Sequence, residues 1–228
     1  MLYPLATNWL LKSKLQSITL DVDSMVKTVY GHQQGAAKGY NPHKPGAKSY
    51  HPLLAFVSEL KLVVNSWFRT GSAYTANGIC EFIKQINAIL PPTINHVFFR
   101  GDSGFFNGEL FDLLESYNWT YLVKVRLKNL KQLLSGQHWI IVDGNPELAY
   151  CEFTHQGANW KKKRTFLKID QIPKDAKKSV NSQQSPVLSR QSSVVQKFKK
   201  ESSTMMQYGW QSFQSIVFRL WFKVAVLL

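Results

Sequence analysis

The order of strand-length and helix-length apolar segments constrains the fold of this chain most. Some apolar segments have the length of strands and are alternating or continuous. In others, the apolar residues recur at helical spacing. Strands are predicted at 17–30, 53–60, 62–71, 96–105 and 119–126, and helices at 72–90, capped by Ser72 or Thr75, and at 107–118. The order β-β-β-α-β-α-β predicts a mixed α/β sheet flanked by helices, antiparallel at its start and parallel afterwards.

Two of these strands carry aspartates. The first contains "LDVDS", with Asp21 and Asp23, and the strand after the first helix runs into "FFRGDSGF", with Asp102. We expect the two strands to be neighbours at the centre of the sheet, with their carboxyl ends at the edge where α/β sheets place their sites. Strand alternation points Asp21 and Asp23 to the same face.

Carboxylates gathered at one edge repel each other unless a divalent cation lies between them. Mg²⁺ and Mn²⁺ prefer such hard oxygen ligands, and a two-metal site of this kind supports phosphodiester transfer. The predicted catalytic residues are Asp23 and Asp102, and the predicted metal ligands are these two and Asp21. Simpler interpretations stay open, with Asp21 as a polar residue on a solvated edge and Asp102 as part of an Asp-Ser-Gly turn.

Several segments, in order, resemble the bacterial insertion-sequence transposases of the DDE type. They are "ITLDVDSMVKTVYGHQQGAAKGYNPHKPGAKSYHPLLAFV", "RTGSAYTANG", "FFRGDSGFFNGELFDLLE" and "YLVKVR", within residues 15–170. The resemblance implies an RNase H-like fold that binds two divalent metals and cleaves and joins DNA. By this resemblance, Asp23 corresponds to the family's first Asp and Asp102 to its second. The resemblance also implies a β-rich insertion after the fifth core strand.

Two features depart from the family pattern. The third carboxylate of the family is a Glu on a helix beyond the β insertion, near Tyr and Arg, and no such context is found here. Beyond residue 170 the sequence holds only Asp175 and Glu201 as acidic residues. The family also has a DNA-binding region before its first Asp, where this chain has about 20 residues. We therefore expect a fragment truncated at both ends, with weak or absent strand transfer.

The charge points to a polyanionic partner. The 228 residues carry a net charge of +14, and residues 161–228 alone hold 14 basic and 3 acidic residues. The partners expected from the resemblance are double-stranded DNA, as transposon ends and target, and a second copy of the chain in the DNA complex. The predicted DNA-binding residues are basic or aromatic and lie near the carboxylate edge or on the last strand: Lys44, Lys48, Tyr50, Arg69, Arg100, Lys124 and Arg126.

We predict three regions along the chain. Residues 15–134 form the partial catalytic core, 135–170 begin the β-rich insertion, and 171–228 form a basic Ser/Gln/Lys-rich tail that is poorly ordered or aberrant. Two cysteines without metal spacing fit a reducing cytosol, and no apolar run reaches the length of a membrane span. A cytoplasmic, nucleoid-associated protein is therefore expected.

Three functions remain open from the sequence. The first is a DDE transposase fragment, active or inactive, and the second is a non-catalytic DNA-binding remnant of a transposase. The third is a metal-dependent nuclease that keeps the RNase H-like layer without transposition. A sheet that ends inside an unfinished insertion exposes edges and apolar surface, so poor solubility is also expected.

Overall fold

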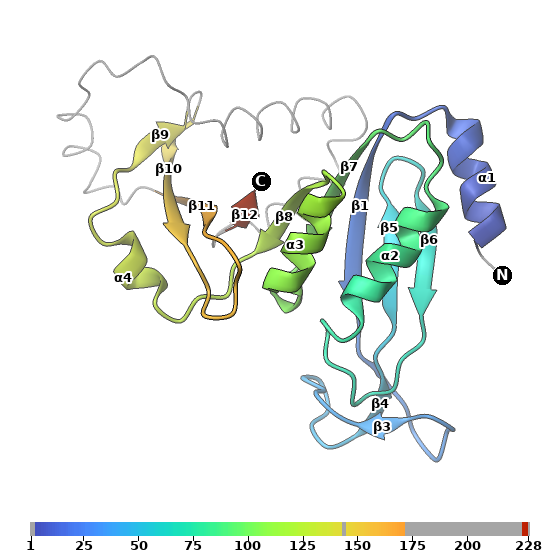
Figure 1. Cartoon of the computed structure of the whole chain (residues 1–228). Helices are drawn as coiled ribbons and strands as arrows, with labels where there is room; N and C mark the ends of the chain where they lie inside the picture. Colours follow the sequence, from blue (N-terminus) through green and yellow to red (C-terminus); the bar gives the residue numbers. More distant parts are fainter. Residues whose placement is uncertain (1–2, 143–144, 172–224, 228) are drawn as a thin grey trace. The chain divides into compact units, whose positions relative to one another are not determined.

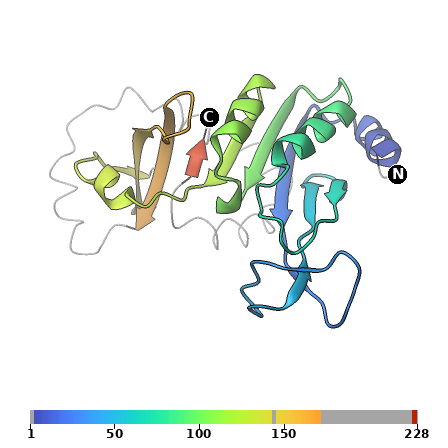
Figure 2. The same ribbon diagram turned by 60° about the horizontal axis from the view of Figure 1, so that its bottom comes forward.

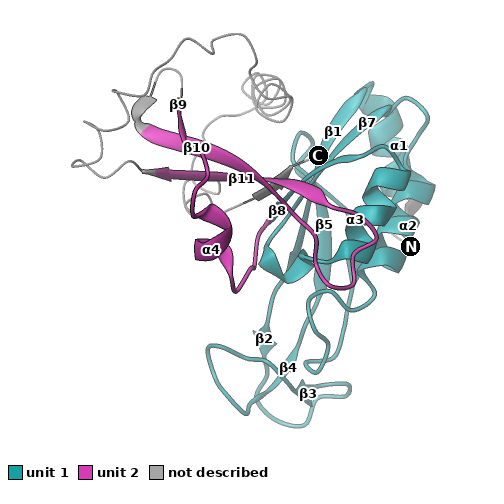
Figure 3. Ribbon diagram, turned by 60° about the vertical axis from the view of Figure 1, so that its left-hand side comes forward, with its two compact units in different colours: residues 1–123 teal, residues 124–228 magenta. Residues whose placement is uncertain are grey.

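The computed structural model describes residues 3–142, 145–171 and 225–227. The chain divides into two compact units, 1–123 and 124–228, which Figure 3 shows in teal and magenta. Each unit is considered by itself below. Most of the predicted tail, including Asp175 and Glu201, lies outside the described residues.

Five strands form the central sheet of the first unit. They are β1 (Ser17–Ser24), β5 (Leu53–Val57), β6 (Leu62–Trp67), β7 (His96–Gly101) and β8 (Thr120–Lys124), in the order β6-β5-β1-β7-β8. Strand β1 is antiparallel to β5 and parallel to β7, and β7 is parallel to β8. This is the mixed sheet that the sequence predicted, antiparallel at its start and parallel afterwards, with the two Asp-bearing strands as central neighbours (Figure 1).

Helices α2 (Ile79–Ile89) and α3 (Gly108–Ser116) lie on one face of this sheet (Figure 1). Their apolar sides bury Phe82, Ile83 and Ile86 from α2 and Leu110, Phe111 and Leu114 from α3. Alternate strand residues such as Leu20 and Phe99 are fully buried as well, and the rings of Phe111 and Tyr121 stack with centroids 4.9 Å apart. The core of the unit therefore lies between the helices and this face.

Helix α2, which is the first helix predicted from the sequence, begins later than predicted. Its N-cap is Gly78, in the left-handed conformation with φ 73°, and neither Ser72 nor Thr75 caps it. The Arg69 guanidinium binds the backbone oxygens of Tyr74, Thr75 and Asn77, which lie between the predicted and the observed start of the helix. A further helix, α1 (Tyr3–Ser13), precedes β1 and was not predicted.

A second, smaller sheet follows directly from the carboxyl end of β1. It contains β2 (Lys27–Thr28), β3 (Ala37–Lys38) and β4 (Lys48–Tyr50), in the order β2-β4-β3. Figures 1 and 2 both show it beyond the arrowhead of β1. The sequence predicted one unbroken strand over 17–30 and no further strand before residue 53, so the break after Ser24 and this small sheet are corrections to that prediction.

The second unit contains α4 (Leu130–Leu134), β9 (Ile140–Val142), β10 (Asn145–His155), β11 (Arg164–Gln171) and β12 (Ala225–Leu227). Strand β10 is antiparallel to β9 and β11, and β11 is antiparallel to β12. Phe153 and Phe166 stack in its core, 5.2 Å apart. Of the basic run 160–164, Arg164 is buried with its guanidinium over the Trp160 ring, so only the three lysines form an exposed basic surface.

The two cysteines are free thiols, half-buried Cys80 and buried Cys151. Burial is the main cause that raises the pKa of both thiols, that of Cys151 to about 11. Among the described helices, none has the length and apolar character needed to cross a membrane.

Gly71 fixes how the chain passes beneath the small sheet. A Cβ atom at this position would meet the backbone oxygens of Ala37 and Ser49 at distances that real Cβ atoms do not reach. The bridge between Tyr50 and Thr70 and the bond from His51 N to Arg69 O, 2.9 Å, hold the same segment in place. Residues 69–71 therefore pack against the small sheet and hold it in place.

We predict that Gly71→Ala lowers the free energy of unfolding by about 1–3 kcal/mol, because the added methyl overpacks this crossing. Chemical denaturation followed by circular dichroism measures the change. The exposed neighbour provides a control, since Ser72→Ala should stay within about 0.5 kcal/mol of wild type. Equal stabilities for the two variants would show that the crossing is not tightly packed.

Candidate active site

Asp23 and Asp102 lie at the same edge of the central sheet. In the parallel pairing of β1 with β7, the last matched residues are Val22 and Gly101. Asp23 is one residue further along β1, and Asp102 follows the end of β7. Both residues are exposed. The structure thus places two carboxylates at the carboxyl ends of adjacent parallel strands, where α/β sheets bind ligands.

Local backbone bonds orient both side chains. Asp102 is the N-cap of a short 3₁₀ helix, Ser103–Phe105, and its Oδ1 accepts a 2.8 Å hydrogen bond from Gly104 N. Oδ1 of Asp23 accepts a bond of the same length from Ser24 N. A carboxylate offers two oxygens and about four lone pairs, so these bonds fix the groups without exhausting their capacity as acceptors. Asp102 is therefore a turn residue and still a candidate ligand.

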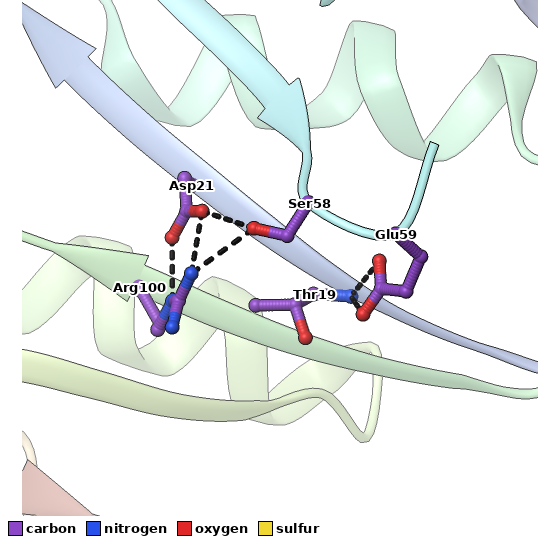
Figure 4. Close-up of polar contacts among 5 residues, drawn as sticks. All are labelled: Thr19, Asp21, Ser58, Glu59 and Arg100. Atoms are coloured by element: carbon purple, nitrogen blue, oxygen red, sulfur yellow. Dashed lines mark hydrogen bonds and ion pairs between the residues drawn. The ribbon is translucent and has the colours of Figure 1, made fainter. Parts of the chain in front are cut away.

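Asp21 has different surroundings, although it lies two residues from Asp23 on the same strand. Arg100 is its direct cross-strand neighbour and donates from Nε to Oδ1 at 2.5 Å and from Nη2 to Oδ2 at 2.6 Å (Figure 4). The Ser58 hydroxyl also donates to Oδ2, and Arg100 Nη2 lies 3.0 Å from Ser58 Oγ. This geometry supports neither the predicted metal-ligand role of Asp21 nor the predicted DNA contact of Arg100.

Glu59 is a further carboxylate next to β1, and sequence reasoning gave it no role. Its two oxygens accept the Thr19 backbone N–H at 2.8 and 3.0 Å (Figure 4). The pairing of β1 with β5 begins only at Leu20, so Glu59 supplies the partner that the strand ladder does not. Asp21 and Glu59 thus maintain the sheet, whereas Asp23 and Asp102 stand at its edge.

Arg69 also has a structural role. Besides the three carbonyls before α2, it donates from Nε to His51 O at 2.9 Å and from Nη2 to Ser24 Oγ at 2.9 Å. Burial lowers the pKa of Arg69 from its usual value. Its predicted DNA contact has little geometric support, because the donors already have protein partners. Instead it ties the residue after Asp23 to the segment leading into α2.

The remaining predicted DNA-binding residues occupy two places. Lys44, Lys48 and Tyr50 belong to the small sheet and its loops, and the Lys44 ammonium lies 4.6 Å from the centre of the Tyr30 ring. Lys124 is the last residue of β8, and exposed Arg126 follows the strand. Sequence reasoning gave no role to Lys27, Lys38 and Phe68, although the lack of acidic residues between Asp23 and Glu59 marks this segment as basic.

Within the described ranges, no three Asp, Glu, His or Cys side chains gather closely enough to hold a metal ion. The two acidic residues considered for the third position, Asp175 and Glu201, lie outside those ranges. The described part of the chain therefore supplies a pair of candidate ligands, not a complete set.

The sequence matches the family model "Transposase DDE domain group 1" over residues 3–183. The chain belongs to this family of DDE transposase domains. The family assignment made from the quoted motifs is thereby confirmed, whereas the bacterial origin and the truncation stay predictions. No curated protein sequence matches this DDE domain.

Solved structures with a similar fold include two transposases. A piggyBac transposase synaptic complex with hairpin DNA aligns at 17% identity and TM-score 0.41, over 70% of this chain and 35% of that one. The Mos1 strand transfer complex aligns at 14% identity and TM-score 0.30, over 53% of this chain and 39% of that one. The DDE domain described here thus corresponds to little more than a third of either chain.

We predict that Asp21 and Arg100 couple strongly in a double-mutant cycle built from Asp21→Asn and Arg100→Met. Their side chains are 30% and 15% exposed and form a bidentate pair, so the coupling energy should be about 1–3 kcal/mol. Equilibrium denaturation of the four proteins measures it.

The control cycle uses Lys84 and Glu81, a surface pair 3.7 Å apart with side chains 55% and 60% exposed. It should couple by about 0.5 kcal/mol or less. A loss of Mn²⁺ binding in Asp21→Asn at unchanged stability would return Asp21 to the candidate metal ligands.

Proposed function

We propose that this DDE domain cleaves and joins DNA during transposition, with Asp23 and Asp102 holding divalent metal. The observation that carries the proposal is the placement of two exposed carboxylates at the carboxyl ends of adjacent parallel strands, in a chain of this family. The other two carboxylates beside β1 already serve the sheet.

The residues present fit a magnesium or manganese ion. Both candidates offer hard carboxylate oxygens, and both are oriented by a backbone N–H bond to Oδ1. When bound, such ions activate a water or a 3′-hydroxyl and stabilise the leaving oxygen of the phosphodiester. Asp23 and Asp102 would each contribute an oxygen ligand at the edge of the sheet. Among the described residues, no third ligand is identified beside these two.

We propose DNA backbone contacts for those predicted basic residues that are exposed or partly exposed. These are Lys44 and Lys48 at the small sheet and Lys124 and Arg126 at the end of the last core strand. Together with the net charge of +14, they suit a polyanion. Arg69 and Arg100 are left out because their donors already have protein partners. Assembly as a homodimer on transposon ends and association with the nucleoid are further parts of this proposal.

A non-catalytic DNA-binding remnant is the second candidate. It is favoured by the excess positive charge, which supports DNA binding without any metal site. The two candidates agree on DNA affinity and disagree on metal-dependent cleavage, so one experiment separates them.

We predict that the full chain binds Mn²⁺ in calorimetry and nicks supercoiled plasmid in its presence. Asp23→Asn and Asp102→Asn should each abolish measurable Mn²⁺ binding and slow nicking by about 100-fold or more, because each removes an anionic ligand. Glu81→Gln is the matched control, since it neutralises an exposed carboxylate on α2, outside the candidate site.

Unchanged duplex binding in all variants would confirm that only the catalytic step is lost. A wild-type chain that binds duplex DNA but neither binds Mn²⁺ nor nicks plasmid would refute the catalytic proposal and leave the remnant.

A further inference from the structure

The small sheet has one face that collects lysines and an aromatic ring. Residues directly opposite each other in a ladder share a face, and so do residues two apart on a strand. Lys27 pairs with Tyr50, and Lys38 pairs with Lys48. Because Lys48 and Tyr50 are two apart on β4, all four side chains lie on one face, which we call the Lys–Tyr face.

Phe68 extends this face with a second aromatic ring. Its centroid lies 4.4 Å from that of Tyr50, with the rings tilted by 42°. The Tyr50 hydroxyl donates a 2.6 Å bond to Gln34 O, which holds its ring in place. Phe68 is nevertheless 74% exposed. The Phe68 ring thus contacts the Tyr50 ring and is otherwise largely exposed, an arrangement that suits stacking by a planar ligand.

The opposite face of the small sheet is already covered. Ser49 and Ala37 face the other way, and the Gly71 backbone packs against them so closely that a Cβ atom would not fit. Ser49 is fully buried. The Lys–Tyr face is therefore the side of this sheet that is available to a ligand.

Charge and position indicate what that ligand is. No acidic residue occurs between Asp23 and Glu59, whereas Lys27, Lys38, Lys44 and Lys48 do. The small sheet begins four residues after Asp23, and Met25 N donates to Pro52 O to hold it at the end of β1. Figure 2 shows the sheet continuing from that end. A polyanion with planar groups, bound next to the candidate active site, satisfies both features.

We propose that the Lys–Tyr face with Phe68 binds unpaired nucleotides of the DNA substrate. The Phe68 ring stacks on an exposed base, while Lys27, Lys38 and Lys48 neutralise the neighbouring phosphates. Single-stranded or frayed DNA is favoured over intact duplex, because bases inside a duplex stack on each other and leave no face for Phe68. The inference rests on the proposed function in that it takes DNA as the substrate.

The test measures binding of a fluorescein-labelled 12-nucleotide oligo(dT) and of a duplex of the same length by anisotropy, in EDTA. We expect Phe68→Ala to weaken single-strand binding about tenfold, the loss of roughly one stacked base, and to change duplex binding less than twofold. Phe68→Trp should restore the affinity, and Phe68→Leu, apolar but without a ring, should not.

Trp9→Ala is the matched control. Trp9 is 61% exposed on α1, which lies at the opposite end of the first unit from the small sheet in Figures 1 and 2, and its removal should leave both affinities unchanged. Lys38→Ala should weaken both ligands and reduce the salt dependence of single-strand binding by about 0.7 in logarithmic slope. Unchanged circular dichroism of each variant shows that the fold is retained.

The proposal is overturned if Phe68→Ala leaves single-strand affinity unchanged, or if it weakens both ligands equally. That failure is distinct from a failure of the proposed function, because the assay contains no divalent metal and measures binding without any cleavage. If the wild-type chain never nicks plasmid but Phe68→Ala weakens its binding to single-stranded DNA, this inference is still supported.

Discussion

The parallel pairing of β1 with β7, in one register, is the constraint on which the rest of this unit depends. A shift by a single residue would turn every side chain of β1 to the other face, taking Leu20 out of the core. The bidentate pair of Asp21 and Arg100 joins directly opposed residues and so reinforces that register. The alignment that buries Leu20 is the same one that brings Asp23 to the edge beside the end of β7.

The three carboxylates on and beside β1 have different roles because their surroundings differ. Asp21 is half-buried against a guanidinium, Glu59 completes the hydrogen bonding of a strand, and Asp23 is exposed at the strand end. Arg69 links this edge to the turn before α2 and to His51, the residue after β4. The candidate site is thus supported by interactions that themselves take no part in chemistry.

The strand and helix order, the central position of the two Asp-bearing strands and the family were all readable from the sequence. Hydrophobic periodicity and ordered motifs carry that information locally. The partners of Asp21, Arg69 and Arg100 were not readable, since each depends on which residue lies across a strand or beneath a turn. The small sheet was missed because its strands have only two or three residues, too few to show alternation.

The late start of α2 shows a related limit. Ser72 and Thr75 are good N-cap residues, yet the helix begins after Gly78, and the Arg69 side chain binds carbonyls of the intervening segment. The capping propensity of Ser72 and Thr75 thus did not decide where the helix begins. Bonds from a side chain to backbone oxygens form only in the folded chain, and the hydrophobic periodicity around the helix does not reveal them.

The thiol chemistry of this chain has a practical consequence. With a pKa of about 11, Cys151 is a thiolate in roughly one molecule in ten thousand at neutral pH, and it is also buried. Cys80 is half-buried with a raised pKa. A cysteine introduced at a fully exposed surface position would therefore react with maleimide dyes well before either native thiol, which would permit site-specific labelling without first removing them.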